Sequence, residues 1–132
     1  MRISQKILAI DFGLKKIGLA LAQDGFIQPL MVVNKETSLS QINRICQENE
    51  IEKIVLGLPP EPLAQKVKEY AQSLRQKVKL SVEFQDETLT SREALAKMIE
   101  GGKKRKVRQQ KQDAYAAACI LEAYLQRKEA HV

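Results

Sequence analysis

The chain has 132 residues, a length that suits one domain built around a single hydrophobic core. Its 22 lysines and arginines outnumber its 16 aspartates and glutamates, and the net charge of +6 favours a polyanionic partner such as nucleic acid. One histidine and two cysteines exclude a Cys/His zinc site. No apolar run approaches the roughly 20 residues of a membrane helix, and no signal peptide is recognisable, so we expect a cytoplasmic protein that keeps clear of membranes.

The first quarter of the chain is rich in apolar runs with β character. These runs predict three strands, over residues 6–12, 17–23 and 26–34. Asp24 and Gly25, between the second and third runs, form a pair typical of a tight hairpin turn. Pro29 marks the third strand as an edge strand, because proline cannot donate to a sheet ladder. We therefore expect an antiparallel meander.

Helical and strand patterns then alternate. Ser38 and Gln41 have the spacing of a capping box that opens a helix ending near residue 50. The following segments predict a strand, a helix and a strand, over residues 53–58, 63–77 and 80–85. Right-handed crossovers place the fourth strand beside the first and the fifth beyond it. The expected fold class is α/β, with a mixed five-stranded sheet in the order 3-2-1-4-5, the first three strands antiparallel, flanked by helices.

The last third of the chain predicts two helices separated by a basic segment. Thr90 and Glu93 form a second capping-box pattern, before a short helix that ends at Gly101 and Gly102. Residues 103–111 are strongly basic and are expected to form a solvated loop. The final helix is predicted over residues 112–127, with a packing stripe of Ala114, Ala117, Ala118, Leu121 and Leu125.

Carboxylates from remote parts of the chain can meet at one edge of this sheet. Asp11 ends the first strand, Asp86 and Glu87 follow the fifth, and Asp113 begins the last helix. Such a cluster repels itself unless Mg²⁺ or Mn²⁺ is bound to its oxygens. Two such ions about 3.5–4 Å apart can activate a water and stabilise the leaving oxygen of a phosphodiester. Each acid alone is equally compatible with a turn or a helix terminus, so the hypothesis depends on the set.

Basic side chains flank the same expected cleft. The candidate nucleic-acid-binding residues are Lys15, Lys16, Arg92, Lys103, Lys104, Arg105, Lys106, Arg108 and Lys111. Three phenylalanines, three tyrosines and no tryptophan leave few platforms for base stacking. We therefore expect contacts to the phosphate backbone rather than to base edges.

Five segments of the chain, in order, resemble motifs of the YqgF/RuvX family, whose members are described as Holliday junction resolvases and pre-16S rRNA nucleases. The segments are Asp11-Phe-Gly-Leu-Lys-Lys-Ile-Gly-Leu-Ala20, Gln28-Pro-Leu30, Ile54-Val-Leu-Gly-Leu-Pro59, Asp86-Glu-Thr-Leu-Thr-Ser91 and Asp113-Ala-Tyr-Ala-Ala-Ala-Cys-Ile-Leu121. The resemblance implies a single ribonuclease H-like domain over residues 1–132. It also implies that Asp11, Glu87 and Asp113 are the catalytic and metal-binding acids, with Asp86 as a substitute for Glu87.

The function implied by the resemblance is metal-dependent hydrolysis of phosphodiester bonds in structured nucleic acid, in pre-16S rRNA processing during ribosome biogenesis. The implied cofactors are two Mg²⁺ or Mn²⁺ ions, the partner is structured RNA or branched DNA, and the protein is a monomer or weak homodimer. The sequence departs from the family at Leu14, Lys16 and Thr88, and at a shortened loop over residues 60–62.

Three alternatives remain open. One is a non-catalytic nucleic-acid-binding module on the same fold, because the departures fall on expected substrate contacts. Another is a Holliday junction resolvase that acts on four-way DNA. The last is a phosphoryl-transfer enzyme, because hairpins of this type also open the actin and sugar-kinase fold.

Overall fold

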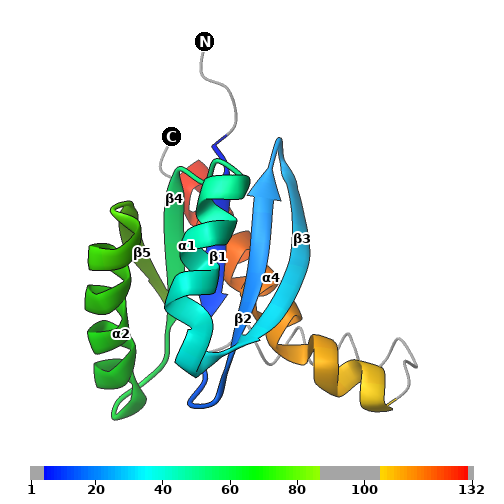
Figure 1. Cartoon of the computed structure of the whole chain (residues 1–132). Helices are drawn as coiled ribbons and strands as arrows, with labels where there is room; N and C mark the ends of the chain where they lie inside the picture. Colours follow the sequence, from blue (N-terminus) through cyan, green and yellow to red (C-terminus); the bar gives the residue numbers. More distant parts are fainter. Residues whose placement is uncertain (1–4, 87–104, 131–132) are drawn as a thin grey trace.

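A five-stranded sheet lies between two layers of helix in the computed structural model, which describes residues 5–86 and 105–130. The strands are β1 (Ile7–Asp11), β2 (Lys16–Gln23), β3 (Phe26–Asn34), β4 (Lys53–Leu58) and β5 (Ser81–Asp86). The helices are the short 3₁₀ turn η1 (Lys35–Thr37) and the α-helices α1 (Ser38–Glu48), α2 (Leu63–Val78) and α4 (Arg105–Ala130). One face of the sheet is covered by α1 and α2, and the other is crossed by α4 (Figure 1).

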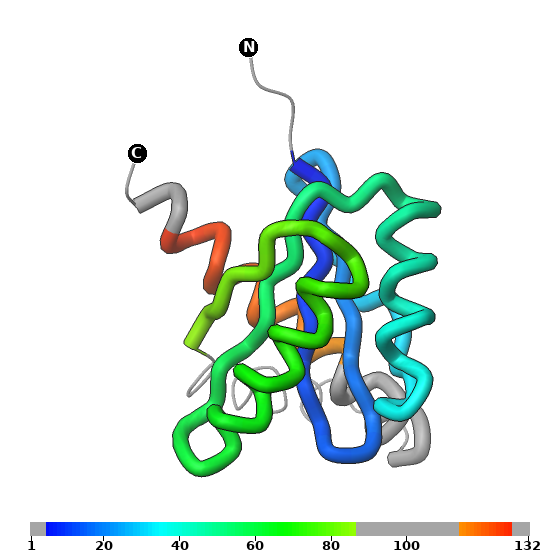
Figure 2. Tube along the Cα trace, turned by 60° about the vertical axis from the view of Figure 1, so that its left-hand side comes forward, coloured from blue at the N-terminus to red at the C-terminus, as the bar shows by residue number. Residues whose placement is uncertain are grey.

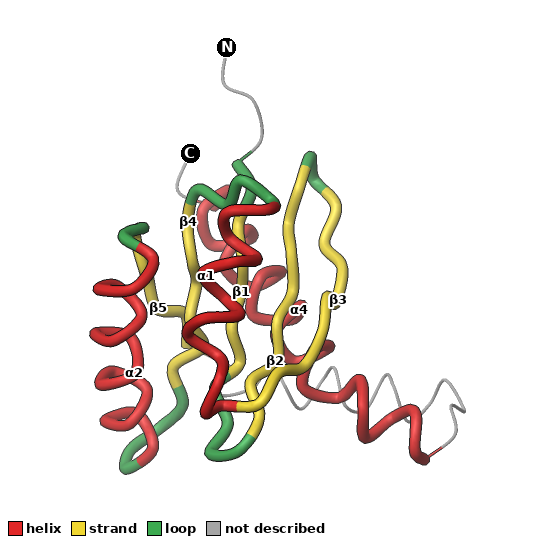
Figure 3. Tube along the Cα trace, in the orientation of Figure 1, coloured by secondary structure: helices red, strands yellow, loops and turns green. Residues whose placement is uncertain are grey.

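The strand order is β3-β2-β1-β4-β5, as the sequence predicts. β1 and β2 pair antiparallel, as do β2 and β3, whereas β1, β4 and β5 are mutually parallel. The carboxyl ends of the three parallel strands therefore lie at one edge of the sheet. Figure 3 shows the β1–β2 turn and the loop from β4 to α2 at this same edge. Asp11, the last residue of β1, therefore lies at this edge.

The β2–β3 hairpin closes on the turn that the sequence predicts. Asp24 and Gly25 both adopt positive φ angles, 54° and 83°, as a hairpin turn with right-handed strand twist requires. β3 is an edge strand and carries Pro29, close to a register shift opposite Leu19 and Ala20. The proline thus occupies an irregular point of an outer strand, where a missing N–H is tolerated.

The face under α1 and α2, called here the front face, holds the larger of two apolar cores. The two helices bury one face each on the sheet, through Ile42, Ile45 and Cys46 of α1 and Val67, Tyr70, Ala71 and Leu74 of α2. They pack on the alternate strand residues that include Leu8, Ile10, Ile54, Leu56 and Val82. Each fully buried leucine or isoleucine contributes roughly 1.5–3 kcal/mol, so this face dominates the stability of the fold.

The opposite face, called here the back face, is built from small side chains. Ala117, Ile120, Leu121 and Tyr124 of α4 pack on Ile7, Ala9, Ala20, Ala22 and Val55. Alanines on both surfaces allow the helix to lie close to the strands, and the rotated view in Figure 2 shows the sheet between the two layers. The small-residue stripe predicted for the last helix is therefore confirmed.

The sequence-based prediction was wrong at two helix starts. Ser38 is the first residue of α1, not its cap; Thr37 occupies the cap position and makes no side-chain capping hydrogen bond. The preceding turn η1 leads directly into the helix, so the Ser38 hydroxyl is buried and bonds elsewhere. α4 begins at Arg105, not at residue 112, so residues 105–111 are helical rather than a loop. Lysine, arginine and glutamine are good helix formers, which explains the extension.

The second capping box, the two cysteines and the apolar character of the helices complete the comparison with the sequence. The second capping box, at Thr90 and Glu93, and the short helix after it lie outside the described residues. Both cysteines are thiols outside any disulfide of the described residues; Cys46 is buried in the front core and Cys119 is half-buried. Among the described helices, none combines the length and the apolar character that crossing a bilayer requires.

Candidate functional site

Asp11 ends β1 on the back face of the sheet. Side chains alternate along a strand, so Asp11 shares a face with Ile7 and Ala9, which pack under α4. It lies opposite Gly18 in β2, and the register that pairs Ile10 with Leu56 brings Gly57 beside it in β4. Both glycines are buried. The half-buried carboxylate is thus bordered on both neighbouring strands by residues without a side chain.

Gln85 is the next residue outward in the same row. It pairs with Gly57, and two strand spacings put it roughly 10 Å from Asp11 across the sheet. Its Nε2 donates to the Asp86 carbonyl at 3.3 Å, while its buried Oε1 has no hydrogen-bond partner within the described part of the chain. The row of Gly18, Asp11, Gly57 and Gln85 thus carries polar groups at the carboxyl edge of the back face. Gly57 belongs to the motif Ile54–Pro59 but has no role assigned from the sequence, and Gln85 belongs to no motif. Strand register alone reveals that both lie in the row of Asp11.

Asp86 lies on the other side of the sheet from Asp11. Along β5 it shares a face with Val82 and Phe84, which pack into the front core, and its side chain is exposed. Strand alternation therefore turns Asp86 away from the row that contains Asp11. Glu87, the neighbouring acid of the predicted site, lies outside the described residues, so the structure brings together no complete acid cluster.

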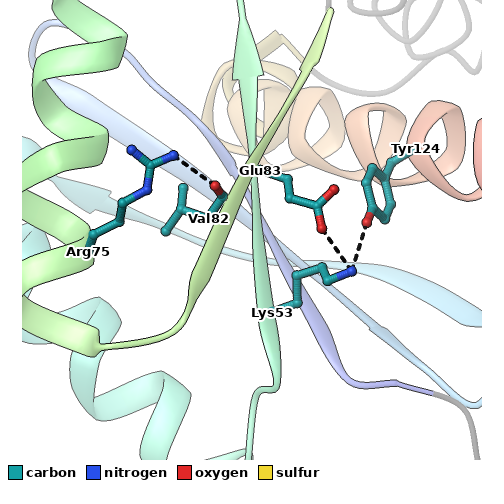
Figure 4. Close-up of polar contacts among 5 residues, drawn as sticks. All are labelled: Lys53, Arg75, Val82, Glu83 and Tyr124. Atoms are coloured by element: carbon teal, nitrogen blue, oxygen red, sulfur yellow. Dashed lines mark hydrogen bonds and ion pairs between the residues drawn. The ribbon is translucent and has the colours of Figure 1, made fainter.

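Polar contacts bind the carboxyl-terminal part of α4 to the back face, at the end of the sheet opposite to Asp11. Lys53, the first residue of β4, forms an ion pair with Glu83 at 2.9 Å and donates a hydrogen bond to the Tyr124 hydroxyl at 3.1 Å (Figure 4). Lys53 lies beside Ile7, at the start of β1. Tyr124 therefore fixes where the helix stands relative to the beginning of that strand.

The direction of α4 determines where position 113 falls. Eleven residues separate Tyr124 from Asp113, a distance of roughly 16 Å along a helix. The four steps along β1 from Ile7 to Asp11 span roughly 13 Å of strand. Position 113 is also about one helical turn before the buried Ala117. The backbone of α4 thus carries position 113 toward the edge where Asp11 lies.

Basic residues lie on two sides of this edge. Lys15 and Lys16 are exposed at the β1–β2 turn. A Cβ at Gly13 would overlap the Lys16 carbonyl oxygen, so the turn needs glycine there to bring the lysines round so closely. The first turns of α4, which contain Arg105, Lys106, Arg108 and Lys111, extend past β3 in Figure 1. The predicted contacts Arg92, Lys103 and Lys104 lie outside the described residues.

The described residues offer a partial set of metal donors. The side chains that the structure describes contain no group of three or more histidine, cysteine, aspartate or glutamate residues placed to hold an ion. The carboxylate oxygens of Asp11 are hard ligands of the type that Mg²⁺ and Mn²⁺ prefer. The chemistry of this one donor, and the glycines that border it, fit a divalent cation.

Comparison with known proteins agrees with the fold and the motifs. The model of the family described as "RuvX: Holliday junction resolvase" matches residues 5–127. A protein named "Putative pre-16S rRNA nuclease" from Syntrophomonas wolfei is 37% identical over 133 residues, covering 91% of this chain and 93% of its own. A protein of the same name from Actinobacillus pleuropneumoniae is 34% identical over 135 residues, covering 94% and 98% of the two chains.

The fold has a counterpart among solved structures. RuvC of T. thermophilus, solved in complex with a Holliday junction substrate, superposes with a TM-score of 0.59 at 16% identity, covering 94% of this chain and 96% of that one. An identity this low shows a shared fold and no more. Together with the family match over nearly the whole chain, it confirms the ribonuclease H-like architecture expected from the motifs. The chain belongs to the RuvX family, a family of nucleases.

Proposed function

We propose that this protein is a metal-dependent endonuclease that hydrolyses phosphodiester bonds in structured nucleic acid during the maturation of pre-16S rRNA. The observation that carries the proposal is the position of Asp11, half-buried at the carboxyl edge of the sheet and bordered by Gly18 and Gly57. The carboxyl edge of a parallel sheet is where open α/β folds place their sites, and carboxylate oxygens are the ligands that Mg²⁺ and Mn²⁺ prefer. The names of the relatives from Syntrophomonas and Actinobacillus supply the RNA substrate.

Asp11, Glu87 and Asp113 are the residues that would hold Mg²⁺ or Mn²⁺ in this proposal. The bound ions would supply activation of the attacking water and stabilisation of the leaving oxygen. Glu87 is preferred to Asp86 as the acid that follows the fifth strand, because the Asp86 side chain lies on the front face, away from Asp11. In the sequence, Glu87 has the same parity as Glu83, which bonds to Lys53 on the back face.

The basic residues would hold the nucleic acid by its phosphates. Lys15 and Lys16 lie at the β1–β2 turn directly after Asp11, and the first turns of α4 carry four more basic residues. Arg92, Lys103 and Lys104 are assigned to the same role from the sequence. A domain over residues 1–132 with this charge would act in the cytoplasm, where precursor rRNA is found. Its binding would weaken steeply as salt is raised.

The test is a cleavage assay on a precursor 16S rRNA fragment and a four-way DNA junction, at low salt with Mg²⁺ or Mn²⁺. Asp11→Asn should abolish cleavage and spare binding, because it removes a charge and keeps the shape. Asp24→Asn is the matched control. It makes the same chemical change at the opposite end of the sheet, where asparagine tolerates the positive φ of 54°. Equal cleavage by the parent protein and Asp11→Asn would reject the nuclease site.

A second candidate function follows from the description of the matched family, which names Holliday junction resolution. A resolvase has two equivalent strands to cut, so it should act as a two-fold dimer. Junction cleavage together with a dimer in sedimentation analysis would favour this function over rRNA processing. Salt-sensitive binding without cleavage of either substrate would favour a non-catalytic nucleic-acid-binding module.

A further inference from the structure

A hollow of about 260 Å³ opens on the front face, at the same edge of the sheet as Asp11. The residues that matter in its lining are Phe12, Leu14, Lys35, Lys66, Glu69 and Tyr70. They come from the β1–β2 turn, from η1 and from α2. Phe12 directly follows Asp11 in the chain and points to the opposite face, so the hollow and the candidate nuclease site are separated by the end of a single strand.

The floor of the hollow is rigid and buried. The rings of Phe12 and Tyr70 contact each other, with centroids 5.1 Å apart and an interplanar angle of 56°. Tyr70 is also fixed through its hydroxyl, which lies 2.6 Å from Ser38 Oγ. Ser38 donates its own proton to the Lys35 carbonyl at 2.7 Å, so the Tyr70 hydroxyl is the donor to Ser38. These contacts join α2, α1 and η1 behind the hollow.

Lys35 is held over this floor. Its backbone N–H donates to the Lys15 carbonyl at 2.8 Å, and its carbonyl accepts from Ser38 at 2.7 Å. Its Nζ lies 5.7 Å from the centroid of the Phe12 ring. Lys66, on α2, supplies a second ammonium group to the lining. Among the residues that the structure describes, neither lysine forms an ion pair, so both can bind an external anion.

The chemistry of the lining selects a phosphate rather than a base. The rings of Phe12 and Tyr70 are only 7% and 8% exposed, too little for a base to stack on them. The two exposed ammonium groups are donors suited to phosphate oxygens. Leu14, 61% exposed at the rim, offers an apolar contact of the kind that a sugar can use.

We propose that this hollow binds a backbone phosphate of the nucleic acid that is cut at the Asp11 site, on the far side of the β1–β2 turn. The cleavage location rests on the function proposed above; the anion site rests on Lys35, Lys66 and the floor beneath them. A polynucleotide strand that rounds the tip of the turn would pass Lys15, which is exposed on that turn and whose carbonyl accepts the Lys35 N–H. The hollow would therefore hold the substrate in register with the nuclease site.

The experiment measures binding of a precursor 16S rRNA fragment to the Asp11→Asn protein, so it needs no cleavage. The observed binding constant is followed between roughly 50 and 200 mM salt, where each phosphate contact contributes about 0.7–0.9 to the logarithmic slope. Lys35→Ala combined with Lys66→Ala should reduce the magnitude of the slope by about 1 relative to Asp11→Asn alone. Lys68→Ala combined with Lys77→Ala is the matched control, because it removes two exposed charges from α2 outside this hollow and should leave the slope nearer the parent value.

Substitution of Glu69 should strengthen nucleic-acid binding, whereas substitution of the two lysines should weaken it. The Glu69 carboxylate lines the hollow and would repel a bound phosphate, so Glu69→Gln should tighten binding by about two- to fivefold at low salt. An equal slope change in the two lysine double variants, or unchanged affinity in Glu69→Gln, would overturn the proposal. If the hollow binds only free phosphate and not the nucleic acid, Lys35→Ala combined with Lys66→Ala would leave the slope unchanged, which would also overturn the proposal. Failure of the nuclease proposal would appear separately, as cleavage that survives Asp11→Asn.

Discussion

Lys53 and Tyr124 join the first residue of β4 to the carboxyl-terminal part of α4, with 3.1 Å between the lysine Nζ and the tyrosine hydroxyl. The ammonium also lies 5.7 Å from the centroid of the tyrosine ring and 2.9 Å from Glu83 Oε2. A single lysine therefore contacts the sheet and the helix at once. Because α4 carries position 113, this contact sets both the stability of the back face and the position of a candidate catalytic residue.

Two substitutions at Tyr124 distinguish what the hydroxyl and the ring each contribute to stability. Tyr124→Phe keeps the buried ring and removes one hydrogen bond, so the free energy of unfolding should fall by about 0.5–1.5 kcal/mol. Tyr124→Ala also removes the ring and should cost about 3–5 kcal/mol, as large-to-small core substitutions do. Urea unfolding followed by circular dichroism measures both values. Equal losses in the two variants would show that the ring contributes nothing beyond its hydroxyl.

The same cluster predicts a dependence of stability on alkaline pH. The hydrogen bond to Glu83 is the main cause that raises the pKa of Lys53 above its ordinary value, and the bond to Tyr124 adds to it. Because the folded pKa is the higher one, the stabilisation is complete below the unfolded pKa of about 10.4 and is lost as pH rises through the folded value. Lys53→Met should therefore lower the free energy of unfolding at neutral pH by about 0.5–1 kcal/mol, within the range of partly exposed ion pairs.

Measurements of the unfolding free energy at alkaline pH supply the control for this prediction. As Lys53 loses its proton in the parent protein, the difference in unfolding free energy between parent and Lys53→Met should shrink above about pH 10.5. Glu83→Gln should remove most of the pH dependence, because it removes the main stabiliser of the charged form. A difference that stays constant from neutral to strongly alkaline pH would contradict the assignment.

Regular periodicity made most of the fold predictable. Of the two errors, one arises from a non-local contact and the other from a helical segment that lacks an apolar stripe. β3 and β4 were predicted to the residue because turn signals bound their apolar runs. Ser38 was misread because a capping-box pattern cannot show that a 3₁₀ turn precedes the helix and buries the hydroxyl under Tyr70. The early start of α4 was missed because a basic run without apolar residues has no helical stripe, although its residues favour helix.

The motifs predict the members of the candidate site but not its geometry. They point to Asp11 and to the acids at the end of the fifth strand, but they cannot choose between Asp86 and its neighbour. That choice depends on which face each side chain occupies, and a one-residue difference inverts the face. The hollow around Lys35 was also invisible in the sequence, because its lining comes from three separate elements.

Ser38, the first residue of α1, is completely buried against Tyr70 of α2, and removal of its hydroxyl should be costly. Ser38→Ala leaves the Lys35 carbonyl without its donor and the Tyr70 hydroxyl without its acceptor, so the free energy of unfolding should fall by about 1–3 kcal/mol. Tyr70→Phe keeps the bond from Ser38 to Lys35 and should cost less. Denaturant unfolding of the two variants decides the order, and a larger loss in Tyr70→Phe would contradict the proposed donor and acceptor roles.

The two cysteines should differ in reactivity. Burial raises the pKa of the Cys46 thiol to about 11, so only about one molecule in a thousand carries the thiolate near pH 8. Cys119 is half-buried on α4 and is accessible in part. Iodoacetamide should therefore modify Cys119 first in the folded protein, and both residues equally in denaturant. Mass spectrometry of tryptic peptides reads the order, and prior labelling of Cys46 would contradict it.

Replacement of Gly57 by alanine should lower the rate of cleavage while leaving the stability of the fold nearly unchanged. Gly57→Ala adds a methyl group beside the Asp11 carboxylate, in a strand where alanine is tolerated at least as well as glycine. Because displacement of a catalytic group by about 1 Å can cost roughly a hundredfold in rate, we expect cleavage to fall at least tenfold. Unfolding by urea should show a stability within about 1 kcal/mol of the parent protein. Unimpaired cleavage by Gly57→Ala would show that the space beside Asp11 is not used in the reaction.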